Sequence, residues 1–149
     1  MAIERERKFL VKYLTYEMLN NNWVRFDQMY LVADIDKQLR IRICYYDHDI
    51  TALITFKEHI NDTDRNEYEY EMKVDEALKV LDEKEYISIL KKKRTNFDGW
   101  DIDVYPNNLM VAEYEYSDEN PFPETLPDWI GNEITGDGYY SNINLAEKK

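Results

Sequence analysis

Cysteine, glycine and proline are all scarce in this chain. Among 149 residues there are one cysteine, four glycines and four prolines. Cys44 alone can form no internal disulfide and no thiolate metal site, so we expect it to be a small packed side chain. The low glycine and proline content excludes collagen-like and linker-like sequences, and a hydrophobic content of 44% excludes broad disorder. The sequence therefore predicts a globular protein whose residues 1–149 form a single domain.

Long apolar runs and an excess of positive charge are also lacking. No apolar run approaches the ~18 residues of a membrane span, and the N-terminus has no signal-peptide core. The net charge is −12, from 31 acidic and 19 basic residues, which repels nucleic acid and anionic membranes at long range. We therefore expect a cytoplasmic protein with neither nucleic acid nor membrane as a partner. An anionic ligand would need a local basic cluster or a metal ion.

Residues arranged for nucleophilic catalysis are missing as well. His48 falls in an expected turn and His59 at the end of an expected strand, and neither has an obvious base partner. No serine, histidine or cysteine triad can be assembled around them. Both histidines are therefore expected at the surface, and a covalent intermediate is not indicated.

Short alternating segments dominate what is present. We expect strands near residues 3–12, 23–32, 39–43, 54–57, 65–72, 90–94, 100–105 and 109–116. Helical patterns cover residues 75–90 and, more briefly, 15–19, and Asp98-Gly99 predicts a tight hairpin. Eight strands in hairpin order around one longer helix favour a mainly β (α+β) fold over a doubly wound α/β fold. The expected architecture is a closed eight-stranded antiparallel β-barrel with a few flanking helices.

The charged faces of these strands are sorted by sign. Side chains two residues apart share a strand face. Acidic rows lie at Glu4 and Glu6, at Glu67, Glu69 and Glu71, and at Glu113 and Glu115; basic rows lie at Arg40 and Arg42 and at Lys92 and Arg94, with Lys8 and Lys57 nearby. Each row alone fits a solvated sheet face, but a solvated surface normally mixes the two signs. Five sorted rows favour a charged barrel lumen, with carboxylates for a divalent metal and basic groups for a polyanion such as phosphate.

The N-terminal segment carries a family resemblance. Ile3-Glu4-Arg5-Glu6-Arg7-Lys8-Phe9-Leu10-Val11 resembles the Glu-x-Glu-x-Lys signature of the CYTH superfamily, the triphosphate tunnel metalloenzymes, in the form found in small bacterial members. Similar motifs follow in the family's order, at residues 28–31, 40–42, 55–57, 69–71, 92–94, 103–105 and 113–115. Residues 129–133 and 140–142 are also similar to that group. Two positions depart from it: Asn107 replaces a common glycine, and Gly138-Tyr139 precede Tyr140 where a basic residue is usual.

The resemblance implies a β tunnel that binds triphosphate and requires Mg²⁺ or Mn²⁺. The matching positions assign metal binding to Glu4, Glu6, Asp103, Glu113 and Glu115, substrate binding to Lys8, Arg40, Arg42, Lys57, Lys92 and Arg94, and catalysis to Lys8, Glu69 and Glu71. Glu69, Glu71 and Asp103 would contribute to metal or water binding. The acid/base role stays open between Lys8, a tunnel carboxylate and a metal-bound hydroxide, with Tyr30 as another polar candidate.

Fold alone does not fix the substrate. The small size and the form of the N-terminal motif favour hydrolysis of inorganic tripolyphosphate to pyrophosphate and phosphate. The alternatives are a class IV-type adenylyl cyclase, a thiamine or nucleoside triphosphatase, and a catalytically silent phosphoanion-binding module. The expected partner is a small-molecule triphosphate, and the expected oligomeric state is a monomer or homodimer.

Overall fold

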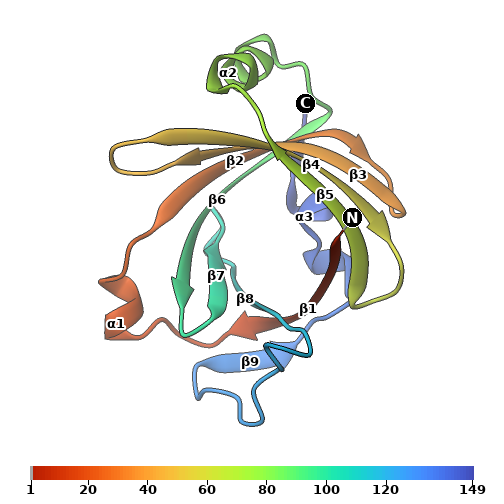
Figure 1. The fold of residues 1–149 in the computed structure, drawn as a ribbon. Coiled ribbons are helices and arrows are strands. Elements are labelled where there is room, and N and C mark those ends of the chain that lie inside the picture. The colour runs from red at the N-terminus through yellow and green to blue at the C-terminus, as the bar shows by residue number, and fades with distance from the viewer. Residues whose placement is uncertain (1) are drawn as a thin grey trace.

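A computed structural model describes residues 2–149. The elements, shown in Figure 1, are β1 (Ala2–Val11), α1 (Tyr16–Leu19), β2 (Val24–Ala33), β3 (Lys37–Tyr45), β4 (Ile50–His59), β5 (Asp64–Glu71), α2 (Val74–Glu83), β6 (Ser88–Phe97), β7 (Trp100–Val104), β8 (Met110–Glu115), β9 (Ile130–Glu133), the 3₁₀ helix η1 (Gly138–Tyr140), α3 (Asn142–Leu145) and β10 (Glu147–Lys148). Within this range no helix is long and apolar enough to cross a membrane.

Eight strands form a closed antiparallel barrel. Their order is β6-β2-β3-β4-β5-β1-β8-β7, and β7 pairs with β6 to complete the ring. The ring is seen end-on in Figure 1, with β9 outside it next to β1 and α2 against the opposite outer wall. The short β10 pairs with β6. The predicted barrel and its eight antiparallel strands are confirmed.

Strand β1 divides its length between two neighbours. Its first residues pair with β5, where Glu4 lies opposite Arg65. From Glu6 onward it pairs with β8, where Glu6 lies opposite Glu115 and Lys8 opposite Glu113. The charged row of β1 therefore borders two other charged rows, one on each side.

Two apolar clusters lie on the outer side of the barrel wall. One joins Met29, Ile41 and Ile43 to Ala77 of α2, and the other joins Phe9 and Trp100 to aromatic residues that include Trp129 and Phe122. These residues alternate along their strands with the charged rows, so burying them outside directs the rows into the lumen. A third cluster, around Tyr30, Leu90 and Val111, packs against Ile143 and Leu145 of the C-terminal segment.

The long predicted helix is wrong at its C-terminal end. The sequence pattern predicted helix over residues 75–90, but α2 ends at Glu83, and Lys84 adopts the left-handed conformation with φ 53°. Its backbone N–H donates to the carbonyls of Val80 and Leu81, which closes the last turn. Residues from Ser88 onward pair with β2 and β7, because these ladder hydrogen bonds and the barrel closure outweigh local helical preference. The capped helix near residue 15 and the hairpin at Asp98-Gly99 are confirmed.

Candidate active site in the barrel lumen

The lumen contains a cavity of about 200 Å³ lined mainly by charged side chains. Ten of the residues predicted from the sequence line it: Glu4, Glu6, Lys8, Arg40, Arg42, Lys57, Glu69, Arg94, Glu113 and Glu115. Glu67 of the second acidic row also lines it, and five further lining residues had been given no role: Gln38, Arg65, Asp101, Ser141 and Asn142. Three predicted site residues, Glu71, Lys92 and Asp103, are not part of its lining. The barrel thus brings most of the sorted rows to one internal surface.

Several ion pairs lie on the lumen wall, and we refer to three of them as the lumen ion pairs. Lys57 Nζ lies 3.1 Å from Glu4 Oε1, an Arg65 terminal nitrogen lies 3.0 Å from Glu6 Oε1, and Lys8 Nζ lies 3.4 Å from Glu113 Oε1. Their side chains are between 11% and 24% exposed, so they are largely buried but still reach the cavity. Both members of each pair line the cavity, and each is therefore accessible to a bound ligand.

The carboxyl groups of these pairs titrate very differently. Burial would raise the pKa of Glu4, but Lys57 outweighs it and lowers that pKa to about 2. For Glu6, burial and the neighbouring Glu113 and Glu4 carboxylates raise the pKa to about 7. Burial acts to lower the pKa of Lys8, but Glu113 and Glu6 reverse this and raise it. The site therefore holds carboxylates that repel one another enough to keep a proton near neutral pH.

Arg40 and Arg42 on β3 differ from the other lumen cations because they have no carboxylate partner among the described residues. Arg42 Nε donates to Gln28 Oε1 at 2.8 Å, whereas the buried Arg40 Nε has no acceptor. Burial, with Arg40 and Arg94 nearby, lowers the pKa of Arg42 to about 9. Buried charges are normally paired, so this side of the lumen is prepared for an anion.

Asp103, Lys92 and Arg94 form a tighter group, which we call the Asp103 triad. Lys92 Nζ lies 2.7 Å from Asp103 Oδ2, and Arg94 donates to both Asp103 oxygens at 2.6 and 2.9 Å. The Lys92 and Asp103 side chains are only 0% and 1% exposed, while Arg94 is 18% exposed and reaches the cavity. Burial would raise the pKa of Asp103, but Arg94 and Lys92 outweigh it and lower that pKa. The triad therefore presents only Arg94 to the lumen.

The remaining carboxylates are those of the second acidic row, Glu67, Glu69 and Glu71, on β5. Glu69 lines the cavity and accepts a hydrogen bond from Thr55 Oγ1 at 3.0 Å. Burial and the Glu4 and Glu69 carboxyl groups outweigh Lys57 and raise the pKa of Glu67 to about 8. Glu71 is exposed at the last residue of β5. Of the two carboxylates assigned to catalysis, the structure brings only Glu69 into the cavity.

The donor set of the lumen fits Mg²⁺ or Mn²⁺, which prefer carboxylate oxygens. Glu4 and Glu6 of β1 adjoin Glu113 and Glu115 of β8, and burial and neighbouring carboxylates raise the pKa of both Glu6 and Glu115. A divalent cation would relieve that repulsion. In the described part of the chain no three acidic, histidine or cysteine side chains form a ready-made cluster, and three of these four glutamates are held by basic partners. Asp103 does not fit, because three N–H groups already occupy its two oxygens.

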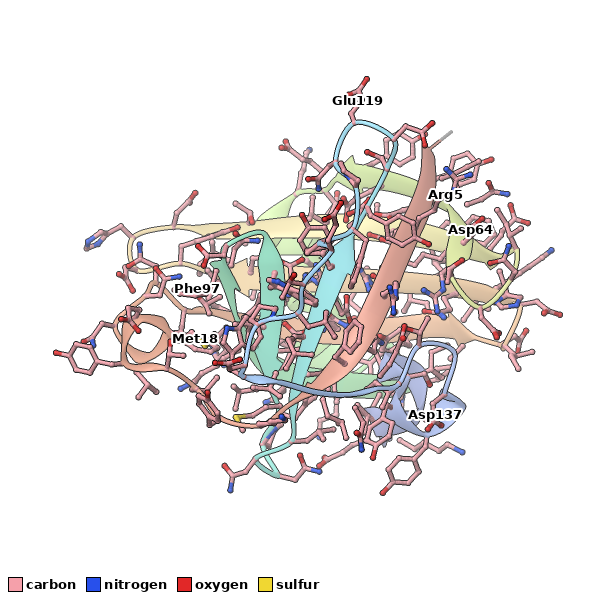
Figure 2. All side chains as sticks on the ribbon, turned by 90° about the horizontal axis from the view of Figure 1, so that it is seen from below. Arg5, Met18, Asp64, Phe97, Glu119 and Asp137 are labelled. Atoms are coloured by element: carbon pink, nitrogen blue, oxygen red, sulfur yellow. The ribbon has the colours of Figure 1, made fainter. Side chains whose placement is uncertain are left out.

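A wider cavity of about 350 Å³ adjoins the lumen at the end nearest the C-terminal segment. The two cavities adjoin, because they share six lining residues: Glu6, Lys8, Gln38, Lys57, Arg65 and Ser141. Figure 2 shows Asp137, which lines the wider cavity, on the C-terminal segment. In the same view Arg5 and Asp64 lie side by side on β1 and β5, joined by a 3.4 Å ion pair. The wider cavity gives a ligand a path from solvent to the lumen cations.

Comparison with known proteins identifies the family. No family model matches the sequence. The "Inorganic triphosphatase" of Acetivibrio thermocellus (strain ATCC 27405) is 37% identical over 155 residues, which cover 99% of this chain and 95% of that protein. Among solved structures, the hypothetical protein NE1496 has a TM-score of 0.60 and 26% identity over 96% of this chain and 97% of that one. A structure of the inorganic triphosphatase NE1496 gives 0.59 and 25% over 98% and 95%. PH1012 from Pyrococcus horikoshii OT3 shares the fold, with a TM-score of 0.55 and 18% identity over 79% and 80%. The protein belongs to the inorganic triphosphatase family.

Proposed function

We propose that this protein hydrolyses inorganic tripolyphosphate to pyrophosphate and phosphate in the barrel lumen, with Mg²⁺ or Mn²⁺, as a triphosphate tunnel metalloenzyme of the CYTH type. The observation that carries this proposal is the pair Arg40 and Arg42, two buried cations that line the cavity without a carboxylate partner. Arginine offers a fork of N–H donors that matches phosphate oxygens. The "Inorganic triphosphatase" relative supports the same reaction.

The lumen ion pairs suit a ligand that carries many charges. When a triphosphate enters, Lys57, Arg65 and Lys8 can turn from their carboxylates to phosphate oxygens within the same cavity. Glu4, Glu6 and Glu113 then lose their cationic partners and become free to hold a metal ion. The same exchange therefore supplies cations for the phosphates and carboxylate ligands for the metal.

Hydrolysis requires water to attack the terminal phosphorus while the bridging phosphorus–oxygen bond breaks and pyrophosphate leaves. Bound Mg²⁺ or Mn²⁺ would neutralise phosphate charge and acidify a coordinated water. Glu69, fixed by Thr55, is the carboxylate that we assign to orient the attacking water and receive its proton. Lys8, which lines both cavities, would hold the terminal phosphoryl oxygens as charge builds on them.

The lining of the lumen favours inorganic triphosphate over a nucleotide. None of the described residues around the 200 Å³ cavity is aromatic, so it offers no ring on which a base could stack. Nearly all lining side chains are charged, which matches a substrate composed of phosphate alone. We therefore expect tripolyphosphate to be hydrolysed in preference to ATP or thiamine triphosphate.

A side-by-side assay tests these assignments. Phosphate release should be measured from tripolyphosphate, ATP and thiamine triphosphate, each with Mg²⁺, with Mn²⁺ and with excess EDTA, and the ATP products should be analysed for cyclic AMP. We expect metal-dependent release that is fastest from tripolyphosphate. Full turnover in EDTA would contradict the metal requirement, and cyclic AMP would identify a cyclase. Binding without turnover of any compound would identify a silent phosphoanion-binding module.

We also propose that the protein acts in the cytoplasm as a monomer or homodimer. The proposed triphosphate site lies within one barrel and uses residues of one chain, so it needs no second copy to complete it. Light scattering coupled to size-exclusion chromatography would measure the oligomeric state.

A further inference from the structure

We propose that Asp103 is a positioning residue, which fixes Arg94 for the triphosphate instead of ligating metal. This inference rests on the proposed function. It concerns the part of the lumen where the sequence pattern and the geometry differ. Asp103 shares a strand face with the lumen carboxylates, yet it is 1% exposed and lies behind the cavity lining.

Both oxygens of Asp103 already accept hydrogen bonds from basic groups. Arg94 Nε donates to Oδ1 at 2.6 Å, and Arg94 Nη2 donates to Oδ2 at 2.9 Å. Lys92 Nζ donates to the same Oδ2 at 2.7 Å. A metal ligated by Asp103 would have to enter a space closed to solvent and compete with two cations for the same carboxylate. The carboxylate is therefore committed to its two basic partners.

Those contacts also orient Arg94. Asp103 holds one edge of the Arg94 guanidinium. Arg94 Nη1 then lies 3.5 Å from Asp101 Oδ2, and Arg94 Nη2 lies 4.0 Å from Glu113 Oε2, and both of these carboxylates line the cavity. Arg94 and Asp103 are paired residues of β6 and β7, so the contact is built into the strands that close the barrel. The Phe26 ring lies 5.3 Å from the guanidinium carbon and supports it from another side. A free arginine would lose side-chain entropy on binding phosphate, and this arrangement removes part of that loss in advance.

Lys92 completes the anchor without reaching the ligand. Its side chain is 0% exposed, its Nζ lies 5.7 Å from the Tyr105 ring centroid, and it is absent from the cavity lining. Its role is to supply a second positive group to Asp103. Only Arg94, of the two basic residues in this row, contacts the lumen.

Asp103→Asn tests the assignment in kinetics. The variant is nearly isosteric, but its amide N–H₂ must replace one of the two oxygens. Arg94 donates to both oxygens, so in either orientation the amide N–H₂ faces another donor and the Arg94 fork is broken. We expect KM for tripolyphosphate to rise about tenfold or more, equivalent to about 1.4 kcal/mol. The MgCl₂ concentration for half-maximal activity should stay unchanged. When Arg94→Lys is already present, Asp103→Asn should raise KM no further, because the fork is already lost.

Asp101→Asn is the matched control, since its oxygen lies 3.5 Å from Arg94, and it should raise KM less. A higher MgCl₂ requirement with KM unchanged, or no change in either quantity, would overturn the proposal.

A measurement on the unmodified protein covers the case in which Asp103→Asn fails to fold. The Arg94 Nε–H should give a slowly exchanging signal in ¹⁵N NMR, identified by its loss in Arg94→Lys. Titration with MgCl₂ alone should leave its position and exchange rate unchanged, whereas displacement by a metal at Asp103 would shift it and speed its exchange. If the protein binds sodium tripolyphosphate without turnover, calorimetric affinity replaces KM. The proposed hydrolysis can then fail while the positioning of Arg94 is still tested.

Discussion

The lumen ion pairs and the Asp103 triad consist of the same kinds of charged group but have different roles. The lumen ion pairs have their closest contacts at 3.0 to 3.4 Å and line a cavity. The triad has contacts of 2.6 to 2.9 Å, and two of its three members are shut away from that cavity. The first group can exchange partners with a ligand, and the second cannot do so without losing buried charge compensation. Access to the cavity, rather than charge, separates binding residues from anchoring residues.

The largest expected effect comes from breaking the triad. Asp103→Ala removes the carboxylate that both Lys92 and Arg94 contact, and loss of one member of a buried pair typically costs about 3–5 kcal/mol of stability. We expect a decrease of this size in the free energy of unfolding, measured by urea denaturation. Asp101→Ala on the same strand is the control, because Asp101 is 39% exposed and should cost less than about 1 kcal/mol. Equal effects of the two substitutions would remove the distinction between the groups.

The next effect is a pH dependence that arises in the lumen ion pairs. The pKa of Glu6 in the folded protein is about 7, above its ordinary value of 4.5, so the folded state retains a proton that the unfolded state releases. Stability in EDTA should therefore fall as pH rises from about 5 to 7, by up to about 3 kcal/mol. Urea denaturation across this range measures the slope. Glu6→Gln should reduce the slope, and saturating MgCl₂ should reduce it as well. The slope that remains in Glu6→Gln should come from Glu67 and Glu115, whose pKa values are also raised. An unchanged slope in Glu6→Gln would contradict the assignment to Glu6.

A smaller change is expected when an unpaired lumen cation is removed. Arg40→Gln should weaken the binding of sodium tripolyphosphate about 30-fold, equivalent to about 2 kcal/mol, because a charge-assisted phosphate contact is lost. The free energy of unfolding should not fall, since the buried Arg40 Nε has no acceptor among the described residues. Calorimetry measures the binding. Lys93→Gln serves as control, because Lys93 is an exposed cation on the wall of the barrel. A loss of binding by the control equal to that of Arg40→Gln would indicate a non-specific charge effect.

Another change is expected at the acidic end of a lumen ion pair. Glu4→Gln keeps an acceptor for Lys57 but removes the counter-charge of a largely buried cation, so the free energy of unfolding should fall by about 1–3 kcal/mol, less than in Asp103→Ala. Metal-dependent phosphate release should fall by about 100-fold, equivalent to about 2.7 kcal/mol of activation free energy, since a proposed metal ligand is lost. Glu71→Gln provides the comparison, because Glu71 is exposed and outside the cavity lining. Loss of activity in Glu71→Gln would restore the catalytic role predicted from the sequence.

Strand periodicity made most of the lumen predictable. Alternation assigns a face to every residue once a strand is recognised, and the sorted charges indicated which face was enclosed. Arg65, Gln38 and Asp101 were missed, although each lies two residues from a predicted charged position on the same strand. Extending each row by one step would have found them. Ser141 and Asn142 lie in the C-terminal segment, where no strand period exists to place them.

Two differences could not have been read from the pattern. Periodicity says which face a residue occupies but not what packs in front of it, so Lys92 and Asp103 were indistinguishable from true lining residues. The end of α2 had no recognisable stop signal, because the left-handed position is filled by Lys84 and not by glycine. Barrel closure determined both outcomes, and it depends on contacts between residues distant in sequence.

The split pairing of β1 has a consequence for how the chain folds. Strand β1 precedes both of these partners in the chain. Its first half can pair only after β5 has been synthesised, and its second half only after β8. Such non-local pairings raise the contact order and slow folding, and domains form while the nascent chain is still emerging. Until β8 is available, Glu6 and Lys8 lack their neighbouring strand, and this edge of β1 is left unpaired. The catalytic chamber is therefore finished late, after the β2–β5 meander can already have formed.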